Sequence, residues 1–245
     1  MRLDKFLAEL NVGTRSQVKD LIRKKLVTVN GAPVTKPEHS IDPETDQVCL
    51  QGKPLIYSQF QYFLLNKPGG VVSATRDKLS ETVLSLLPND HKKDLFPVGR
   101  LDKDTSGLLL LTNDGDFAHR VISPKSAVEK CYSARVDGEV DEEDVKAFRE
   151  GLTLRDGTCC LPAILEPLEH GACRVRVKEG KYHQVRRMLA SRGKPVLELR
   201  RLSVGALLLD EQLGPGGWKE LDQEALCRVF SPDPMGKTSK KPSNF

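Results

Sequence analysis

Two aspartates stand close together in a short loop that leads into the most apolar run of the sequence. Asp102 and Asp104 belong to the segment 97–107, PVGRLDKDTSG, and four leucines follow at 108–111. A leucine run of this kind predicts a buried strand, so at least one of the two carboxylates is carried next to the core. A carboxylate in such a place can bind a metal ion, attack an electrophile or move a proton.

Residue types alone leave three interpretations of this loop open. A calcium loop would use Asp102, Asp104 and Ser106, but its twelfth position is Asn113, where a bidentate glutamate is required. A phosphatase-type D-x-D-x-T nucleophile would end an apolar strand, and the Gly-Arg pair at 99–100 interrupts any such strand. The third interpretation is an acid-rich turn between strands, with no chemistry of its own.

The other candidates for chemistry give weaker signals. His183 has no second histidine, cysteine or acid at ligand spacing, so we expect no metal site. The segment 67–70, KPGG, lacks the Walker spacing of a phosphate loop, and there is no G-x-G-x-x-G dinucleotide fingerprint. The six cysteines include no C-x-x-C pair, which argues against a zinc knuckle or a disulfide scaffold.

Strand and helix signals are mixed after residue 60. Apolar and β-branched runs predict strands at 62–66, 71–74, 108–112, 132–136, 172–178 and 196–204. Helical spacing of apolar residues predicts helices at 80–87, 114–123, 141–150 and 183–192. Because these elements do not alternate as regular βαβ units, the predicted fold class is α+β.

A separate small unit is predicted at the N-terminus. One helix spans residues 2–10, and a second begins after an N-cap at Ser16. A short strand at 27–29 then ends at the hairpin turn Asn30-Gly31. We therefore predict three parts: an N-terminal domain with its linker at 1–57, a larger domain at 58–230, and a Pro-, Ser- and Lys-rich disordered tail at 231–245.

Charge is distributed very unevenly along the 245 residues. The chain has a net charge of +4, yet residues 1–36 carry eight basic and three acidic side chains, and residues 174–201 carry ten basic and two acidic ones. The rest of the chain is therefore acidic. Two basic segments on an acidic chain indicate localised contact with a polyanion such as nucleic acid.

The composition excludes a membrane protein. No stretch approaches the roughly 18 consecutive apolar residues of a membrane span, and the N-terminal segment carries Asp4 and Glu9 where a secretory signal would be apolar. We expect no membrane partner and a cytoplasmic location.

Several segments carry a resemblance to known families. Residues 14–31, TRSQVKDLIRKKLVTVNG, resemble the S4 RNA-binding module, in which two helices and a small hairpin present a basic face to structured RNA. Five further segments resemble pseudouridine synthases: 62–70 (YFLLNKPGG), 99–115 (GRLDKDTSGLLLLTNDG), 129–132 (EKCY), 179–189 (EGKYHQVRRML) and 199–205 (LRRLSVG). The departures are slight, with Lys181 where arginine is commoner and Val204 where isoleucine is. The resemblance spans about residues 1–230, in the family's order.

The resemblance implies a fold and three catalytic roles. An S4-like module would precede a mixed β-sheet synthase domain, and the enzyme would isomerise uridine in RNA without a cofactor or metal. Asp102 would be the catalytic aspartate, either attacking C1′ or removing the 2′ proton. Tyr132 would stack on the detached base, and Arg186 would keep the carboxylate charged. Asp104 would be a turn acid.

The resemblance and the charge pattern also predict RNA-contacting residues. Arg187 is turned about 100° round its helix from Arg186 and is the better phosphate contact. The full predicted set comprises Arg15, Lys19, Arg23 and Lys24 in the N-terminal unit and Lys67, Arg100, Lys130, Lys181, His183, Gln184 and Arg187 in the larger one.

The predicted substrate is ribosomal RNA. The segment 182–188, YHQVRRM, is similar to that of the synthases acting on small-subunit rRNA, which implies 16S rRNA within a small-subunit assembly intermediate, at the uridine that the family numbers 516. Two alternatives stay open: a uridine of 23S rRNA, or a non-catalytic rRNA-binding protein of ribosome assembly. We expect a monomer.

Overall fold

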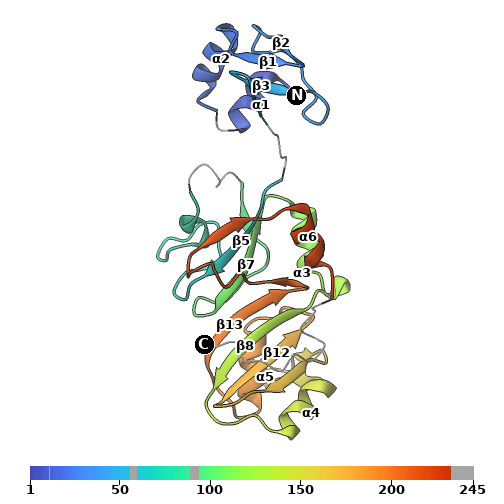
Figure 1. Ribbon diagram of the computed structural model, residues 1–245. Helices are drawn as coiled ribbons and strands as arrows, with labels where there is room; N and C mark the ends of the chain where they lie inside the picture. Colours follow the sequence, from blue (N-terminus) through green and yellow to red (C-terminus); the bar gives the residue numbers. More distant parts are fainter. Residues whose placement is uncertain (11, 56–59, 89–93, 233–245) are drawn as a thin grey trace. The chain divides into compact units, whose positions relative to one another are not determined.

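The chain folds into two compact units, Met1–Gln59 and Phe60–Phe245, in the computed structural model (Figure 1). The structure describes residues 1–10, 12–55, 60–88 and 94–232. From residue 233 onward the predicted tail lies outside these residues, as do residues 56–59, which include the predicted boundary between 57 and 58. Each unit has its own hydrophobic core, so each is described by itself.

Two helices of the first unit cover a small sheet. Helix α1 spans Leu3–Glu9 and buries Leu3, Phe6 and Leu7, while α2 spans Arg15–Arg23 and buries Val18 and Ile22. These side chains meet in one cluster because each helix repeats its apolar residues at helical spacing. The predicted N-cap of α2 at Ser16 is wrong.

Thr14 caps α2 instead. Its hydroxyl accepts a hydrogen bond from the Gln17 amide, and the Gln17 side chain accepts one from the Thr14 amide at 2.8 Å. This reciprocal capping box satisfies two amides, whereas a cap at Ser16 would satisfy one at most. Helix α2 therefore starts earlier than predicted, at Arg15.

The sheet of the first unit has the order β2-β1-β3-β4. Its strands are β1 (Val27–Val29), β2 (Ala32–Pro33), β3 (Val48–Leu50) and β4 (Lys53–Pro54). Val29 pairs with Ala32 across the Asn30-Gly31 turn, and both turn residues have positive φ, 51° and 80°. That pair of angles matches the right-handed twist of a two-residue hairpin, as the sequence predicts.

The second unit is built on a long mixed sheet of nine strands within the described residues, with the order β11-β12-β8-β13-β7-β5-β15 and two short additions, β14 on β13 and β6 on β7 (Figure 1). The strands are β5 (Tyr62–Lys67), β6 (Phe96–Pro97), β7 (Ser106–Thr112), β8 (Lys130–Val136), β11 (Ile164–Pro167), β12 (Ala172–Val177), β13 (Val196–Val204), β14 (Leu207–Leu208) and β15 (Trp218–Glu220). A separate hairpin pairs β9 (Leu152–Thr153) with β10 (Cys159–Cys160).

Helices cover this sheet in two groups. They are α3 (Gly115–Ile122), α4 (Glu142–Glu150), α5 (Gln184–Ser191) and α6 (Gln223–Val229), with short 3-10 turns η1 (Val83–Leu86) and η3 (Pro124–Ser126). Side chains of α3 and α6 share a core cluster with β7, whereas those of α4 and α5 share one with β8 and β12. No helix among the described residues is long and apolar enough to cross a membrane.

Strand β7 is buried on both faces, which explains its leucine run. Leu108 and Leu110 enter the cluster beneath α3 and α6, whereas Leu109 and Leu111 enter a different cluster with Leu101. Alternate residues of a strand point to opposite faces, so an all-leucine strand serves two cores at once. The loop that precedes β7, with Asp102 in it, is thereby fixed against a rigid strand.

Two predicted elements are wrong. Residues 71–74 form only an isolated bridge between Val72 and Thr82 and not a strand. Of the predicted helix at 80–87, only Val83–Leu86 are helical, as the short 3-10 turn η1. A proline disfavours the helical conformation at the residue before it. Leu87 precedes Pro88 and has an extended backbone, with φ −93° and ψ 150°. The apolar residues there pack with Leu101 and with Leu109 and Leu111 of β7 instead of along a helix face.

Candidate active site

Ser73 holds the loop that carries Asp102. Its hydroxyl donates to the Leu101 carbonyl at 2.9 Å and accepts from the Leu101 amide at 3.1 Å, so both polar groups of the residue before Asp102 are satisfied. Residues 103 and 104 form the turn that follows, and the Thr105 amide donates to the Asp102 carbonyl at 3.1 Å. Asp104 is exposed on this turn.

Lys67 also holds this loop, through hydrogen bonds to backbone carbonyls. The end of its side chain donates to the carbonyls of Pro68, Lys103 and Thr105 at 2.9, 3.0 and 2.8 Å, and the side chain has no exposed surface. Burial lowers its pKa to about 8, although the nearby Asp104 and Asp102 oppose this shift. The prediction of Lys67 as an RNA contact is therefore wrong, because the ammonium group is bound by the protein's own backbone.

The Asp102 carboxylate faces two basic side chains from the start of α5. The His183 Nε2 atom lies 3.4 Å from Asp102 Oδ1, and the Arg186 Nε atom lies 3.8 Å from Oδ2. The Asp102 side chain is 28% exposed, so it is open to a bound substrate. Arg186 is itself held by β13, where its Nη1 donates to the Val196 carbonyl at 3.3 Å.

A buried polar network fixes the start of α5. Glu179 is 5% exposed, and its carboxylate accepts hydrogen bonds from the Leu161 amide and from the Gln184 and Lys181 side chains, at 2.9, 2.7 and 2.6 Å. The Gln184 side chain also accepts from the Lys181 amide at 3.0 Å. Gln184 is thus buried within its own turn, and its predicted RNA contact is wrong. The network fixes the direction in which His183 and Arg186 project.

Tyr132 lies in the centre of the sheet. It stands on β8 between Val175 of β12 and Arg201 of β13. Its side chain is half-buried and packs against two core clusters, one of which contains Leu101, the neighbour of Asp102. This packing places Tyr132 beside the loop that carries Asp102. Its stacking role stays a prediction.

A close approach of two backbones joins the halves of the site. Strand β13 pairs with β7 in parallel, with Arg201 opposite Gly107, and pairs with β8 on its other side. The Arg201 side chain is buried, and its Nε donates to the Leu108 carbonyl at 2.7 Å. The strand that carries Tyr132 and the loop that carries Asp102 are thereby held by one intervening strand.

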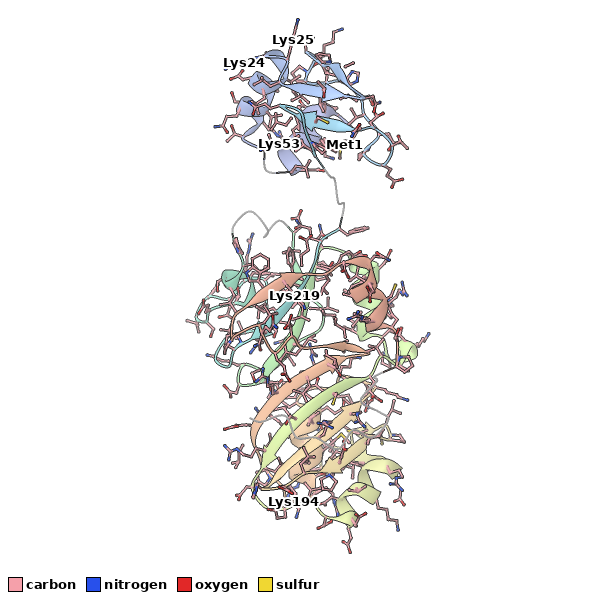
Figure 2. The ribbon with its side chains drawn as sticks, viewed as in Figure 1. Met1, Lys24, Lys25, Lys53, Lys194 and Lys219 are labelled. Atoms are coloured by element: carbon pink, nitrogen blue, oxygen red, sulfur yellow. The ribbon has the colours of Figure 1, made fainter. Side chains whose placement is uncertain are left out.

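The predicted RNA contacts of the first unit are all on its surface. Arg15, Lys19, Arg23 and Lys24 are exposed on α2 or directly after it. Lys24 and Lys25 lie at the turn that follows α2 (Figure 2). The one ion pair described among them joins Arg23 to Asp20 at 3.7 Å, which leaves the basic face available to phosphates.

The predicted contacts of the second unit are more varied. Arg100 is exposed two residues before Asp102, whereas Lys181 pairs with Glu179 and Arg187 pairs with Asp156 at 2.5 Å. Lys130 is 7% exposed and donates to the Val121 carbonyl at 3.1 Å, and burial lowers its pKa to about 8. Its predicted RNA contact is therefore wrong, for the same reason as that of Lys67.

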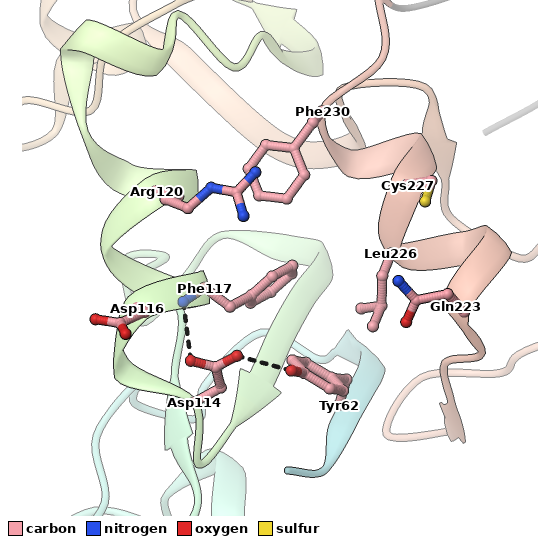
Figure 3. Close-up of a pocket in the computed structure, with 9 residues that line it drawn as sticks. All are labelled: Tyr62, Asp114, Asp116, Phe117, Arg120, Gln223, Leu226, Cys227 and Phe230. Carbon is pink, nitrogen blue, oxygen red and sulfur yellow. Dashed lines mark hydrogen bonds between the residues drawn. The ribbon is translucent and has the colours of Figure 1, made fainter.

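A pocket between α3 and α6 lies apart from these residues (Figure 3). The Tyr62 hydroxyl donates to Asp114 at 2.7 Å at one side of it, and the Arg120 guanidinium stands 4.2 Å from the centre of the Phe230 ring at another. Burial and the Asp114 carboxylate raise the pKa of Tyr62. The Tyr62 hydroxyl is thus paired with Asp114, and none of the predicted catalytic residues lines the pocket.

Three residues of the site are absent from the functional set that the sequence predicts. Ser73 positions the loop that carries Asp102, Glu179 positions α5, and Tyr182 is a strongly exposed aromatic next to His183. Ser73 has no signal in a single sequence, because serine is common on surfaces, and Glu179 is marked only by its place in the segment 179–189. Tyr182 has a signal, since an aromatic residue within a basic segment is typical of nucleic-acid binding.

Comparison with known proteins places the chain in a family. Residues 61–191 match the family model described as RNA pseudouridylate synthase, and residues 1–48 match the S4 domain. The chain is 41% identical over 237 residues to an uncharacterised RNA pseudouridine synthase of Bacillus subtilis, YtzG, covering 95% of this chain and 99% of the relative. It is also 41% identical to the ribosomal small subunit pseudouridine synthase A of Pseudomonas aeruginosa, over 94% of this chain and all of the relative.

A solved structure agrees with these matches. A crystal structure of a pseudouridylate synthase superimposes with a TM-score of 0.67 at 38% identity, covering 94% of this chain and 99% of that one. Both the sequence and the fold are thus matched over nearly the whole length. The chain belongs to the pseudouridine synthase family of RNA-modifying isomerases, with an N-terminal S4 domain preceding its synthase domain.

Proposed function

We propose that the chain converts a uridine of small-subunit 16S rRNA to pseudouridine, with Asp102 as the catalytic carboxylate and without a cofactor. The observation that carries the proposal is the position of Asp102, a partly exposed carboxylate that faces Arg186 and His183 on a loop held rigid by Ser73 and Lys67. A protein that only bound RNA would gain nothing from a carboxylate there, since it repels phosphate.

The reaction rearranges bonds without any change of oxidation state. The N1–C1′ bond breaks, the uracil turns while it stays bound, and a C5–C1′ bond forms. C5 gives up its proton and N1 gains one, so the atoms balance without an oxidant or reductant. Asp102 either attacks C1′ or removes the 2′ proton, and both routes need the carboxylate ionised and close to the sugar.

The neighbours of Asp102 meet the remaining needs of this reaction. The Arg186 guanidinium, 3.8 Å away, favours the ionised carboxylate when a base covers the site and excludes water. Tyr132 offers an aromatic ring that stacks on uracil in any orientation, an interaction typically worth about 1–3 kcal/mol. The base is thereby retained while its glycosidic bond is broken.

The choice of 16S rRNA rests on the relatives. Proteins named ribosomal small subunit pseudouridine synthase A in Pseudomonas aeruginosa and Escherichia coli are 41% and 38% identical to this chain, each over 94% of it. We place the reaction in the cytoplasm, on a small-subunit assembly intermediate whose RNA is partly folded, with the enzyme acting as a monomer.

Tritium release tests the activity. RNA labelled at C5 of uridine loses tritium only if the isomerisation occurs, so the wild-type chain should release it from 16S rRNA and the Asp102→Asn variant should not. The target is tested separately, by carbodiimide primer extension in a strain that lacks the protein. If the 16S site is still modified there and a 23S position has lost its mark, the 16S assignment is wrong and the 23S alternative replaces it.

A further inference from the structure

Two stacked aromatic rings lie beside the candidate catalytic carboxylate. The rings of Tyr182 and His183 lie 3.9 Å apart between centroids, with 17° between their planes. The inner ring belongs to His183, whose Nε2 is 3.4 Å from Asp102. Tyr182 is 75% exposed. One exposed aromatic side chain needs no partner by itself, but this ring is stacked on the residue that contacts Asp102.

The backbone holds the two rings in this arrangement against its own preference. His183 has φ 47° and ψ 35°, the left-handed conformation that a residue with a side chain seldom adopts. The buried network of Glu179, Lys181 and Gln184 keeps the turn in place, and the Arg187 side chain donates to the Tyr182 carbonyl at 3.3 Å. The pair is therefore ordered before any ligand arrives, which lowers the entropy cost of binding.

The chemistry of the surroundings indicates what the exposed ring binds. Arg186 and Arg187 are partly exposed on the same short segment, at 24% and 27%, so a polyanion is attracted there. Uridine must leave its stack to reach the carboxylate, and this leaves the adjacent base with one uncovered face. A base stacked on Tyr182 would cover that face, and it would be a neighbour of the reacting uridine because His183 stands between Tyr182 and Asp102.

We propose that the Tyr182–His183 pair is a stacking subsite for the nucleobase next to the target uridine in a single-stranded stretch of RNA. The inference rests on the proposed function, since it takes Asp102 as the place where the uridine reacts. It adds to that function a means of holding the RNA strand in register at the moment when the target base leaves its stack.

Equilibrium binding tests the subsite without turnover. In an Asp102→Asn background, a 16S rRNA fragment containing the target uridine should bind Tyr182→Ala roughly 5- to 150-fold more weakly than Tyr182, the range expected for the loss of one base stack. Tyr182→Phe keeps the ring and should bind normally. Ile164→Ala, which removes a half-exposed apolar side chain of β11, serves as the matched control and should also bind normally.

A double-mutant cycle then identifies the RNA partner. An RNA with an abasic site next to the target uridine should bind the Tyr182 protein more weakly, and Tyr182→Ala should add no further loss on that RNA. The slope of log K against log salt should stay the same for Tyr182→Ala, because stacking releases no counterions. His183→Asn tolerates the left-handed backbone and should lose part of the affinity, because Tyr182 loses the ring beneath it.

Three results would overturn the inference. The first is equal affinity of the Tyr182→Ala variant and the Tyr182 protein for the RNA. The second is that the affinity losses from Tyr182→Ala and from the abasic site are additive, whichever neighbour of the uridine is abasic. The third is a loss with Tyr182→Ala that appears only when ribosomal proteins are present, which would assign the ring to a protein partner. Tritium release by the wild-type chain, measured on the same RNA and on small-subunit assembly intermediates, separates the two proposals. If it is absent from both, the proposed function fails; if it is present with any of the three results, only the stacking subsite fails.

Discussion

Arg201 of β13 lies directly opposite Gly107 of β7, and its backbone leaves no room for a side chain at that glycine. A Cβ on Gly107 would stand 2.2 Å from the Arg201 carbonyl oxygen, and Gly107 has a φ of 101°. The glycine lies just after the loop that carries Asp102. The close approach of β13 to β7 therefore sets where the loop that carries Asp102 ends and the strand begins.

Gly107→Ala should damage both stability and activity. The methyl group meets backbone atoms that cannot move without separating two strands, so the free energy of unfolding should fall by about 2–5 kcal/mol. Denaturant unfolding measures this loss. Gly115→Ala is the matched control, because nothing lies within 4 Å of a Cβ there and alanine is the better helix former at the first residue of α3. Equal stability of the two variants would contradict the assignment.

Asp102→Asn should fold normally, bind RNA and release no tritium. The amide has nearly the shape of the carboxylate, so it removes the charge without opening a cavity. Asp104→Asn should keep most of the activity, since Asp104 is exposed on the turn and faces neither Arg186 nor His183 in any described ion pair. An inactive Asp104→Asn with an active Asp102→Asn would reverse the two roles.

Activity should fall as the pH rises through about 8. Burial lowers the pKa of Lys67 to about 8, and the neutral amine has two protons to donate where three carbonyls now accept, so the catalytic loop loses a hydrogen bond and a nearby positive charge. Single-turnover rates measured between pH 6 and pH 10 would show the fall. In Lys67→Met the rate should be low and independent of pH in this range.

Unfolding does not account for such a fall. Between about pH 8 and 10.5 the unfolded chain binds more protons at Lys67 than the folded chain does, so the contribution of this residue to the free energy of unfolding rises with pH. Lys130 has a similarly lowered pKa and provides the control. If Lys130→Met alone removes the alkaline fall, then Lys130 is the responsible group.

Deleting residues 1–55 should weaken rRNA binding but leave a folded synthase domain. The two units have separate cores, so the second does not depend on the first for its packing. For every RNA phosphate that the shortened chain no longer binds, the slope of log K against log salt should flatten by roughly 0.7. The triple variant of Arg15, Lys19 and Arg23 to Gln should reproduce most of this change with the domain intact. An unchanged slope in both would mean that α2 does not touch RNA.

The sequence predicts the strands best where an apolar run crosses the centre of the sheet. The stretch 196–204 is β13 with the same bounds, and 132–136 lies within β8. Residues 71–74 and 80–87 are apolar but wrongly assigned, because their side chains fill space under a loop, and burial of that kind has no period.

The sequence predicts which residue types form the candidate site, but not which of their side chains are buried. Asp102 and Arg186 lie together as the family resemblance implies. The sequence assigns Lys67, Lys130 and Gln184 to RNA because lysine and glutamine are usually exposed, yet each points inward to carbonyls or a carboxylate. A sequence motif identifies a residue, but it does not tell whether the side chain faces the substrate or binds the protein's own backbone.

The place of β13 in the sheet has a consequence for biosynthesis. Asp102 and β7 belong to one half of the sheet and Tyr132 and α5 to the other, and residues 196–204 form the strand between them. A nascent chain whose residues 196–204 are still inside the ribosome contains Asp102, Tyr132 and Arg186 but lacks the strand that pairs with both β7 and β8. We therefore expect a chain truncated before residue 196 to lack the arrangement of these three side chains.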